Sequence, residues 1–301
     1  MSRGRAELAL AGVTVVWGAT FVVVKTAIIH VPPLLFVALR FSLAAVALGG
    51  IYAGALWRQR ARAGAWVWPG IAAGSLLFIA YVFQTIGLKY TTPSKSAFLT
   101  GLSIPLVPFV SSFVYKSRPR LFEVAGVLVA SAGMVLMTLP TGKPAMGRGD
   151  ILSVFCAVAF AFHIVLIGHY APLIGFETLA ALQVATAAAL GLATFRLEQP
   201  DAAHFTVEVA AAVLITGLLA TALAFTTMAW AQQYTSATRA ALIFALEPVV
   251  AWITSFLLSG EKLAGRGVSG ACLILTGIVM VELKRTDVRK HHRERVADPD
   301  V

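Results

Sequence analysis

Four ionisable side chains, Lys25, Arg40, His163 and Glu247, fall inside long apolar stretches of the sequence. In a membrane-spanning helix such a group costs roughly 2.5 to 3.5 kcal/mol at the helix centre, so it marks a function or a specific partner. Glu247 is the only carboxylate deep within such a stretch. It must pair with a cation, accept hydrogen bonds or take up a proton. Three interpretations therefore stand: a structural pair with Lys25 or Arg40, a satisfied group at a Pro248 kink where a backbone donor is missing, or a group that carries a proton or contacts a solute.

The other three groups suggest different roles. His163 is either a hydrogen-bonded packing group or a pH-responsive group, since an unperturbed imidazole titrates at about pH 6.5. Arg40 is predicted to be structural, bonding backbone carbonyls or a partner helix. Lys25 lies near the end of the first apolar stretch, where its ammonium either reaches the interface or gates an anionic solute. Glu247, Lys25 and His163 are therefore the candidates for coupling or gating, with the structural alternatives left open.

The composition places these groups in a membrane protein. Hydrophobic residues make up 58% of the chain and charged residues 13%, with a mean hydropathy of +0.83, which no soluble core of this length requires. Ten stretches are apolar enough to cross about 30 Å of hydrocarbon. They lie at about residues 8–28, 34–56, 66–87, 96–115, 121–139, 151–170, 178–195, 207–229, 238–258 and 267–283.

The two halves of the chain repeat each other. Residues 88–97 reappear 144 positions later as residues 232–241, and Gly126 and Gly133 align with Gly270 and Gly277. If each copy crosses the membrane five times, the second copy must enter from the opposite side. The predicted fold is therefore an all-α integral membrane protein, with ten transmembrane helices arranged as two inverted-topology five-helix repeats.

This layout divides the chain into five segments. They are an N-terminus (1–7), a first repeat (8–140), an inter-repeat loop (141–150), a second repeat (151–283) and a basic tail (284–301). The formal net charge of +10 comes mostly from Lys and Arg at span ends, which favours both termini in the cytoplasm. We expect a multi-pass protein of a bacterial inner membrane that binds no nucleic acid.

Enzyme motifs are missing from the sequence. It holds no HExxH or GxSxG pattern, and Gly142-Lys143 is followed by Pro144 rather than by the Ser or Thr of a phosphate-binding loop. Cys156 and Cys272 lie in separate spans, which favours free thiols over a disulfide or a metal site. We therefore expect no catalytic residues, no metal, no cofactor and no ATP-driven step within this chain.

Several short motifs resemble the EamA-type family of the drug/metabolite transporter superfamily. They are Trp17-Gly18-Ala19-Thr20-Phe21, Arg40-Phe41, Leu246-Glu247-Pro248 and Gly260-Glu261. The resemblance runs from about residue 7 to 283, although Ser117-Arg118 stands where the first repeat of that family often carries Gly-Glu. It implies ten helices in two inverted repeats, a central cavity lined by helices 1, 3, 4, 6, 8 and 9, and export of small metabolites, amino acids or drugs.

The internal repeat also selects candidate cavity residues. A shift of 143 places Trp17 on Phe160, Thr20 on His163 and Arg40 on Gln183. Aromatic groups with a few hydrogen-bonding side chains suit an amphipathic or aromatic solute. The predicted lining is Trp17, Thr20, Phe21, Tyr81, Gln84, Phe98, Ser103, Phe160, His163, Thr227, Trp230 and Phe244.

Prolines and glycines suggest where the helices bend and pack. Pro105 and Pro248 occupy matching helices and are the predicted hinges. The glycines of helices 5 and 10 permit close backbone approach, for packing within the chain or contact in a dimer. Both a monomer and a homodimer remain open.

The sequence thus predicts a secondary transporter of small organic solutes that exports them by alternating access, with proton coupling as one option. The alternative is a non-transporting membrane sensor, lipid-handling protein or assembly subunit. Nothing in the residues encodes the substrate, the direction of flux or the driving ion.

Overall fold

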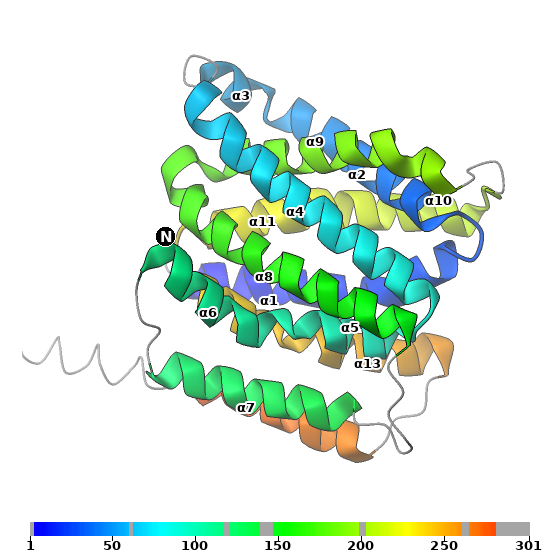
Figure 1. Cartoon of the computed structure of the whole chain (residues 1–301), viewed down its shortest axis with the longest axis vertical. Coiled ribbons are helices and arrows are strands. Elements are labelled where there is room, and N and C mark those ends of the chain that lie inside the picture. The colour runs from blue at the N-terminus through cyan, green and yellow to red at the C-terminus, as the bar shows by residue number, and fades with distance from the viewer. Residues whose placement is uncertain are drawn as a thin grey trace, which may run out of the picture.

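The computed structural model describes residues 3–59, 63–116, 121–138, 147–198, 203–260 and 265–280, and every regular element in these residues is a helix (Figure 1). The basic tail 284–301 and most of the predicted loop 141–150 lie outside the described residues.

The helices of the first half are connected by short turns. They are α1 (Arg3–Ala27), α2 (Pro33–Ile51), α3 (Ala53–Gln59), α4 (Ala63–Lys89), α5 (Pro93–Gly101), α6 (Ser103–Tyr115) and α7 (Leu121–Thr138). The second half follows the same order. It consists of α8 (Arg148–Ile174), α9 (Phe176–Thr194), the short η2 (Phe195–Glu198), α10 (Val207–Leu214), the π-helical η4 (Ile215–Leu223), α11 (Ala224–Ala231), α12 (Ala237–Phe244), α13 (Leu246–Ser259) and a last helix, Gly265–Met280.

Eight helical segments of the described chain are long and apolar enough to cross a membrane. Four of them join shorter elements: Pro93–Tyr115, Phe176–Glu198, Val207–Ala231 and Ala237–Ser259. The helices Leu121–Leu136 and Gly265–Met280 are apolar but shorter. The sequence prediction is therefore confirmed for eight spans, and the fifth and tenth stay predictions.

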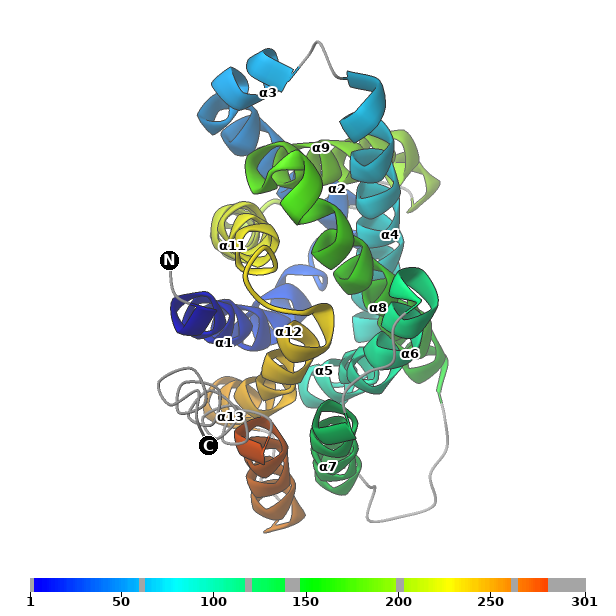
Figure 2. The ribbon, with the colours of Figure 1, turned by 90° about the vertical axis from the view of Figure 1, so that its left-hand side faces the viewer.

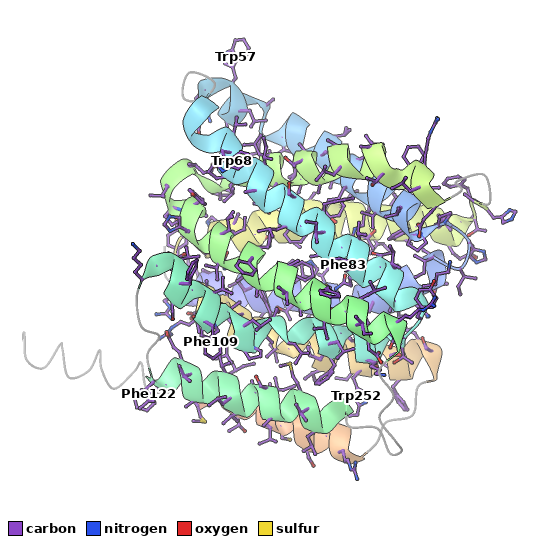
Figure 3. The ribbon with its side chains drawn as sticks, in the orientation of Figure 1. Trp57, Trp68, Phe83, Phe109, Phe122 and Trp252 are labelled. Atoms are coloured by element: carbon purple, nitrogen blue, oxygen red, sulfur yellow. The ribbon has the colours of Figure 1, made fainter. Side chains whose placement is uncertain are left out.

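The outside of the helix assembly carries large apolar side chains, as a protein surrounded by lipid requires. Trp57, Trp68 and Phe109 are 67%, 71% and 74% exposed and point away from the helices (Figure 3). A soluble monomer rarely exposes apolar surface of this extent. Cys156 is buried and Cys272 is exposed, and both are free thiols, in agreement with the prediction.

The fourth and ninth spans are each interrupted at the same place. Leu102 separates α5 from α6, and Ala245 separates α12 from α13, with φ/ψ of −60°/−13° and −60°/−14°. The cause lies three residues later, at Pro105 and Pro248. Proline cannot donate to the carbonyl four residues before it, and its ring clashes with that carbonyl. The Leu102 and Ala245 N–H groups turn instead to carbonyls three residues back, at 3.2 and 3.1 Å.

The last helices of the two halves pack backbone against backbone. A β-carbon at Gly133 would lie 2.5 Å from the Gly270 carbonyl oxygen, and one at Gly277 would lie 2.5 Å from the Gly126 carbonyl oxygen. These four glycines are two equivalent pairs, so the contact is reciprocal and the two helices run antiparallel. Figure 2 shows the last helix, in orange, beside α7. The predicted close approach is thus a contact within the chain.

A second reciprocal contact interlocks the halves near their centre. Gly74 of α4 packs against the Gln183 carbonyl of α9, and the equivalent Gly217 packs against the Arg40 carbonyl of α2, at 3.1 Å from a β-carbon. A helix of each half is therefore seated on a helix of the other. This exchange places α1, α4, α8 and α11 around a common centre (Figure 2).

Candidate functional site

A cavity lies at this centre, and both halves of the chain line it. The volume that the centre of a water molecule can occupy in this cavity is about 50 Å³, which is room for a few waters. Pockets that hold drug-sized ligands are several times larger. An organic solute is therefore too large for the cavity in this conformation, and its entry requires side chains or helices to move apart.

Most of the predicted lining residues meet here. The structure brings the following predicted residues to the cavity wall: Trp17, Thr20, Phe21, Tyr81, Gln84, Ser103, Phe160, His163, Phe244 and Glu247. Arg40, predicted as a structural charge, also lines the cavity. Whether these residues contact a substrate stays a prediction.

Both helix breaks adjoin the cavity. Gly101 and Ser103 come from the break between α5 and α6, and Phe244 and Glu247 come from the break between α12 and α13. Because Pro105 and Pro248 lack an N–H, the carbonyls of Gly101 and Phe244 lose their helical donors. Interrupted helices of this kind offer carbonyl oxygens to a bound solute or cation near the middle of the membrane.

An aromatic cluster fills one side of the cavity, with Phe225 at its centre. The Phe225 ring centroid lies 5.3 Å from Trp17, 6.0 Å from Tyr81 and 5.7 Å from His163. Trp17 also contacts Phe244 at 5.2 Å, and its Nε1 donates to the Ala220 carbonyl at 2.9 Å. Tilted and edge-on rings in such numbers give a stiff apolar wall that still offers π faces to a cation.

Arg40 is 2% exposed and links three elements around the cavity. Its Nε and Nη2 donate to Thr221 Oγ1 at 3.2 and 2.9 Å, and Nη2 donates to the Thr216 carbonyl at 3.4 Å. Thr221 Oγ1 in turn donates to the same Thr216 carbonyl at 2.7 Å, across the widened turn of η4. The guanidinium carbon lies 4.4 Å from the Tyr81 ring centroid, a cation–π geometry. These contacts agree with the predicted bonding of Arg40 to a partner helix.

Glu247 lies in the first turn of α13 and faces the cavity. If its role is structural, it was predicted either to pair with Lys25 or Arg40 or to be satisfied at the Pro248 kink. Arg40 binds η4, and Lys25 Nζ donates to the carbonyls of Leu88, Lys89 and Thr91 at 2.6, 3.2 and 3.0 Å. The pairing prediction is wrong. The ion pairs between described residues do not include Glu247.

His163 is fully buried and bonded to the residue equivalent to Arg40. Its Nε2 lies 2.7 Å from Gln183 Oε1, and because that oxygen is an acceptor, the imidazole proton sits on Nε2. Among the described residues, His163 Nδ1 and Gln183 Nε2 have no hydrogen-bond partner. The ring thus keeps one free nitrogen beside the cavity.

Four predicted residues lie elsewhere. Phe98, Thr227 and Trp230 are not part of the cavity wall, and Lys25 sits beyond it at the end of α1. Phe225 and Met228 line the cavity instead of Thr227 and Trp230, because neighbouring positions of a helix face different directions. Thr100 and Gly101 take the place expected for Phe98, which packs into the apolar core.

The missed residues had a signal in the sequence. Phe225 and Met228 are the repeat equivalents of Tyr81 and Gln84, and both of those line the cavity. Strict use of the 144-residue shift would have chosen them over the polar Thr227. Side-chain polarity was the poorer guide here, since the wall is built largely of aromatic residues.

Known proteins resemble the chain over nearly its whole length. The EamA-like transporter family model matches it twice, at residues 4–139 and 147–283. A protein of Archaeoglobus fulgidus named "Uncharacterized transporter" is 34% identical, with 93% of this chain and 86% of that protein covered. A "Probable amino-acid metabolite efflux pump" of Salmonella typhimurium is 27% identical, with 92% and 94% covered.

A solved crystal structure shares the fold. It superimposes with a TM-score of 0.76 at 23% identity and covers 94% of this chain and 99% of that one. Two matches of one family model, one to each half, agree with the internal repeat read from the sequence. The chain is therefore a multi-pass membrane protein that belongs to the EamA-like transporter family.

Proposed function

We propose that the protein is a secondary transporter that exports small organic solutes by alternating access around the central cavity. The observation that carries this proposal is the cavity itself. It is too small for an organic solute in this conformation, lies between two interlocked halves, and holds a carboxylate, Glu247, outside the ion pairs of the described residues. A cavity shared by two equivalent halves opens to opposite sides when the halves rock against each other.

The inverted arrangement of the repeats is part of the proposal. The reciprocal contacts of Gly133 with Gly270 and of Gly277 with Gly126 join equivalent helices that run antiparallel. Two copies related by an axis in the membrane plane make contacts of this kind. The basic span ends favour both termini in the cytoplasm of a bacterial inner membrane.

The cavity chemistry favours an amphipathic solute with a charged group, such as an amino acid, a related metabolite or a cationic drug. Glu247 offers a negative charge to an ammonium group, and Arg40 offers a positive charge to a carboxylate. The aromatic wall around Phe225 accepts an apolar or aromatic side chain. The name of the Salmonella typhimurium relative supports an amino-acid metabolite as cargo.

Proton coupling follows from the same carboxylate. A buried acid outside an ion pair binds either a proton or a cationic solute, and competition between the two couples their movements. His163 is the second candidate, because its Nδ1 has no partner in the described part of the chain.

The test is counterflow and pH-jump flux in proteoliposomes with labelled amino acids and cationic drugs. Wild type, Glu247→Gln and His163→Ala are compared. Glu208→Gln and His204→Ala serve as matched controls, since both residues are exposed outside the cavity. We expect wild-type flux to follow the proton gradient and Glu247→Gln flux to ignore it.

Each other outcome has a distinct meaning. Exchange that ignores the gradient in both proteins makes the protein a facilitator and Glu247 a structural group. Solute binding without net flux in any protein contradicts transport and favours the sensor alternative.

A further inference from the structure

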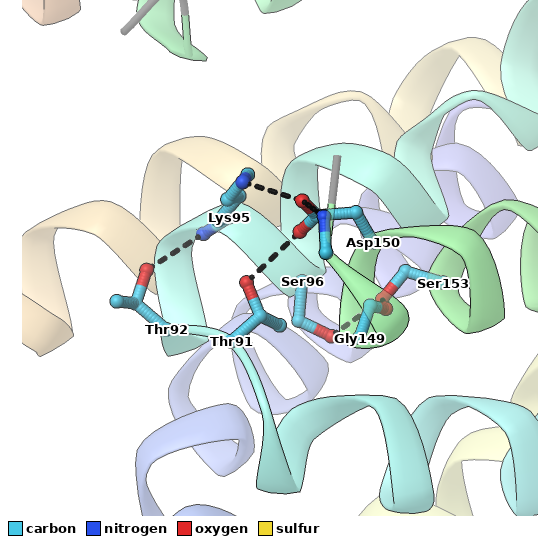
Figure 4. A network of polar contacts seen from close by, with 8 residues as sticks. Thr91, Thr92, Lys95, Ser96, Gly149, Asp150 and Ser153 are labelled. Carbon is cyan, nitrogen blue, oxygen red and sulfur yellow. Dashed lines mark hydrogen bonds and ion pairs between the residues drawn. The ribbon is translucent and has the colours of Figure 1, made fainter. Parts of the chain in front are cut away.

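A polar cluster lies beyond one end of the central cavity. We call it the Asp150 cluster and define it as Thr91, Lys95 and Asp150. Asp150 Oδ2 accepts from Lys95 Nζ at 2.6 Å, and its Oδ1 accepts from Thr91 Oγ1 at 3.2 Å (Figure 4). Asp150 begins α8 in the second half, whereas Thr91 and Lys95 begin the fourth span in the first half. The cluster therefore ties the two halves together.

A second cluster joins other elements of the two halves. We call it the Glu7 cluster and define it as Glu7, Thr235 and Arg239. Glu7 Oε1, in the second turn of α1, accepts from Thr235 Oγ1 at 3.2 Å. Arg239 Nε pairs with Glu123 Oε1 of α7 at 3.2 Å, whereas Glu7 Oε1 pairs with Arg3 Nε of the same helix at 2.6 Å. Thr235 and Arg239 flank the start of α12 in the second half, so this cluster also crosses between halves.

The two clusters occupy equivalent positions of the repeat. Thr235 and Arg239 stand 144 positions after Thr91 and Lys95, and Asp150 stands 143 positions after Glu7. The threonine-to-carboxylate bond has the same length, 3.2 Å, in both clusters. The type of residue is retained at all three positions: a threonine, a basic residue and an acidic residue.

The clusters lie at opposite ends of the molecule. Glu7 stands near the start of α1, and Lys25 near its end bonds the Thr91 carbonyl of the other cluster. At 1.5 Å per residue these two positions of α1 are about 27 Å apart. The cavity residues Trp17 and Thr20 lie between them. Figure 1 shows the starts of α1 and α8 at opposite ends of the helix assembly.

Side chains next to each cluster reach the cavity wall. Lys25 Nζ donates to the carbonyl of Leu88, which lines the cavity, at 2.6 Å. At the other end, Gln232 Nε2 donates to the carbonyl of Ile164, which also lines the cavity, at 3.2 Å. Residues 88 and 232 are repeat equivalents. Each cluster thus connects directly to the helices that enclose the cavity.

We propose that the Asp150 cluster and the Glu7 cluster are the two gates of the transporter, one at each end of the cavity. Both are formed in this conformation, in which the cavity is too small for an organic solute. Opening one end separates the carboxylate of that end from its partners, while the other cluster holds. The inference rests on the proposed alternating-access function and adds the residues that control access to each side.

The charges suit a contact that must break and re-form. The Lys95 side chain is 41% exposed and the Asp150 side chain 5%, so water replaces the lost contacts when the end opens. A partly exposed ion pair contributes little to stability, and this small contribution lets the gate open without a large barrier. A fully dry ion pair would be far costlier to separate.

The test measures access to the cavity from each side of the membrane. Ser103→Cys provides a reporter thiol in the cavity wall, in a background in which Cys156 and Cys272 are replaced by Ala. Sealed vesicles of each orientation are treated with a membrane-impermeant thiol reagent. We expect Asp150→Asn to raise the labelling rate about fivefold from the face of residues 90–92, the upper range for a partly exposed pair. Glu7→Gln should raise it from the opposite face.

Matched controls lie at the same two ends. Glu208→Gln removes an exposed carboxylate near the Asp150 end. Glu208 is placed there because the His204 N–H, four residues before it, bonds the His30 carbonyl just beyond the end of α1. Glu177→Gln removes a partly exposed carboxylate near the Glu7 end, where Gln233 Nε2 bonds the Ala171 carbonyl at the end of α8. Neither control should change labelling from either face.

The outcomes separate the gates from the proposed function. Faster labelling from the same face in Asp150→Asn and Glu7→Gln, or no change in either variant, would contradict the proposal that the two clusters are gates. If a variant unfolds and labels from both faces, Thr91→Val and Thr235→Val repeat the test with only a hydroxyl removed. Labelling needs no substrate. If the variants change labelling from opposite faces but the protein shows no solute flux, the proposed transport is refuted and the gates are not. If solute flux is present but labelling does not change in this way, the gates are refuted and the transport is not.

Discussion

The fourth and ninth spans, Pro93–Tyr115 and Ala237–Ser259, share one backbone plan but differ in chemistry. Each begins at a hydroxyl N-cap, Thr92 or Ser236, and each breaks three residues before a proline. Each ends in a left-handed residue, Lys116 or Gly260, with φ of 51° or 65°. Beside the break, however, the fourth span carries Ile104 where the ninth carries Glu247, and both residues line the cavity.

This difference separates the features that both copies of a duplicated fold must share from the side chains that can differ between the copies. The break, the cap and the left-handed end are set by backbone hydrogen bonds, so both copies need similar residues there. The side chain beside the break needs only to fit the cavity. One copy can therefore hold the charge while the other supplies an apolar wall.

The largest expected effect breaks this chemical asymmetry. Glu247→Gln should weaken binding of a solute that carries an ammonium group by about 100-fold, which is roughly 2.7 kcal/mol, because it removes one partner of a buried charge contact. Ile104→Leu, at the equivalent position, should change binding less than threefold. Equilibrium binding of labelled solute to detergent-purified protein measures both. Similar losses in the two variants would mean that the cavity is sensitive to shape rather than to charge.

The second prediction concerns the shared break. Pro105→Ala or Pro248→Ala restores a helical donor to the Gly101 or Phe244 carbonyl and should straighten the span. Stiffer spans interconvert more slowly, so we expect counterflow to slow about tenfold, roughly 1.4 kcal/mol in the barrier. Solute affinity should change much less. An equal loss of rate and affinity in either variant would reduce the prolines to a folding role.

These examples also show how far the sequence could predict the structure. Hydropathy located eight spans, and the repeat shift paired Pro105 with Pro248 and Lys95 with Arg239. These features depend on local composition and on backbone rules. The 144-residue shift could also have found Phe225 and Met228. That Glu247 forms an ion pair with neither Lys25 nor Arg40 depends on how helices from the two halves face one another. No local pattern encodes that relation.

The π-helical segment η4 is a further case. Nothing in Ile215–Leu223 marks a widened turn, because its residues fit an α-helix equally well. The turn is held by Arg40, which lies far away in the sequence and bonds both Thr216 and Thr221. Sequence reasoning found Arg40 as a buried anchor but could not identify the turn that it binds.

The third prediction tests the left-handed ends of the two spans. A residue with a β-carbon is strained at positive φ, whereas glycine is not. Lys116→Gly should therefore raise the free energy of unfolding by about 1 kcal/mol, and Gly260→Ala should lower it by a similar amount. A β-carbon at Gly260 meets no atom within 4 Å, so backbone strain alone is tested. Thermal unfolding in detergent measures both changes, and changes of the same sign would contradict the shared geometry.

The smallest expected effects concern the starts of the same spans. Thr92 Oγ1 accepts from the Lys95 N–H at 3.3 Å, and Ser236 Oγ accepts from the Arg239 N–H at 3.4 Å. Because these caps satisfy equivalent orphan donors, Thr92→Ala and Ser236→Ala should each cost about 0.5 to 1 kcal/mol of stability. The same thermal unfolding assay measures both costs, with Ser94→Ala, in the first turn of α5, as a comparison. A cost at Ser236 several times that at Thr92 would show that the ninth span, which carries Glu247, depends more on its start than the fourth. The two backbones would then differ in stability as well as in the residues beside the break.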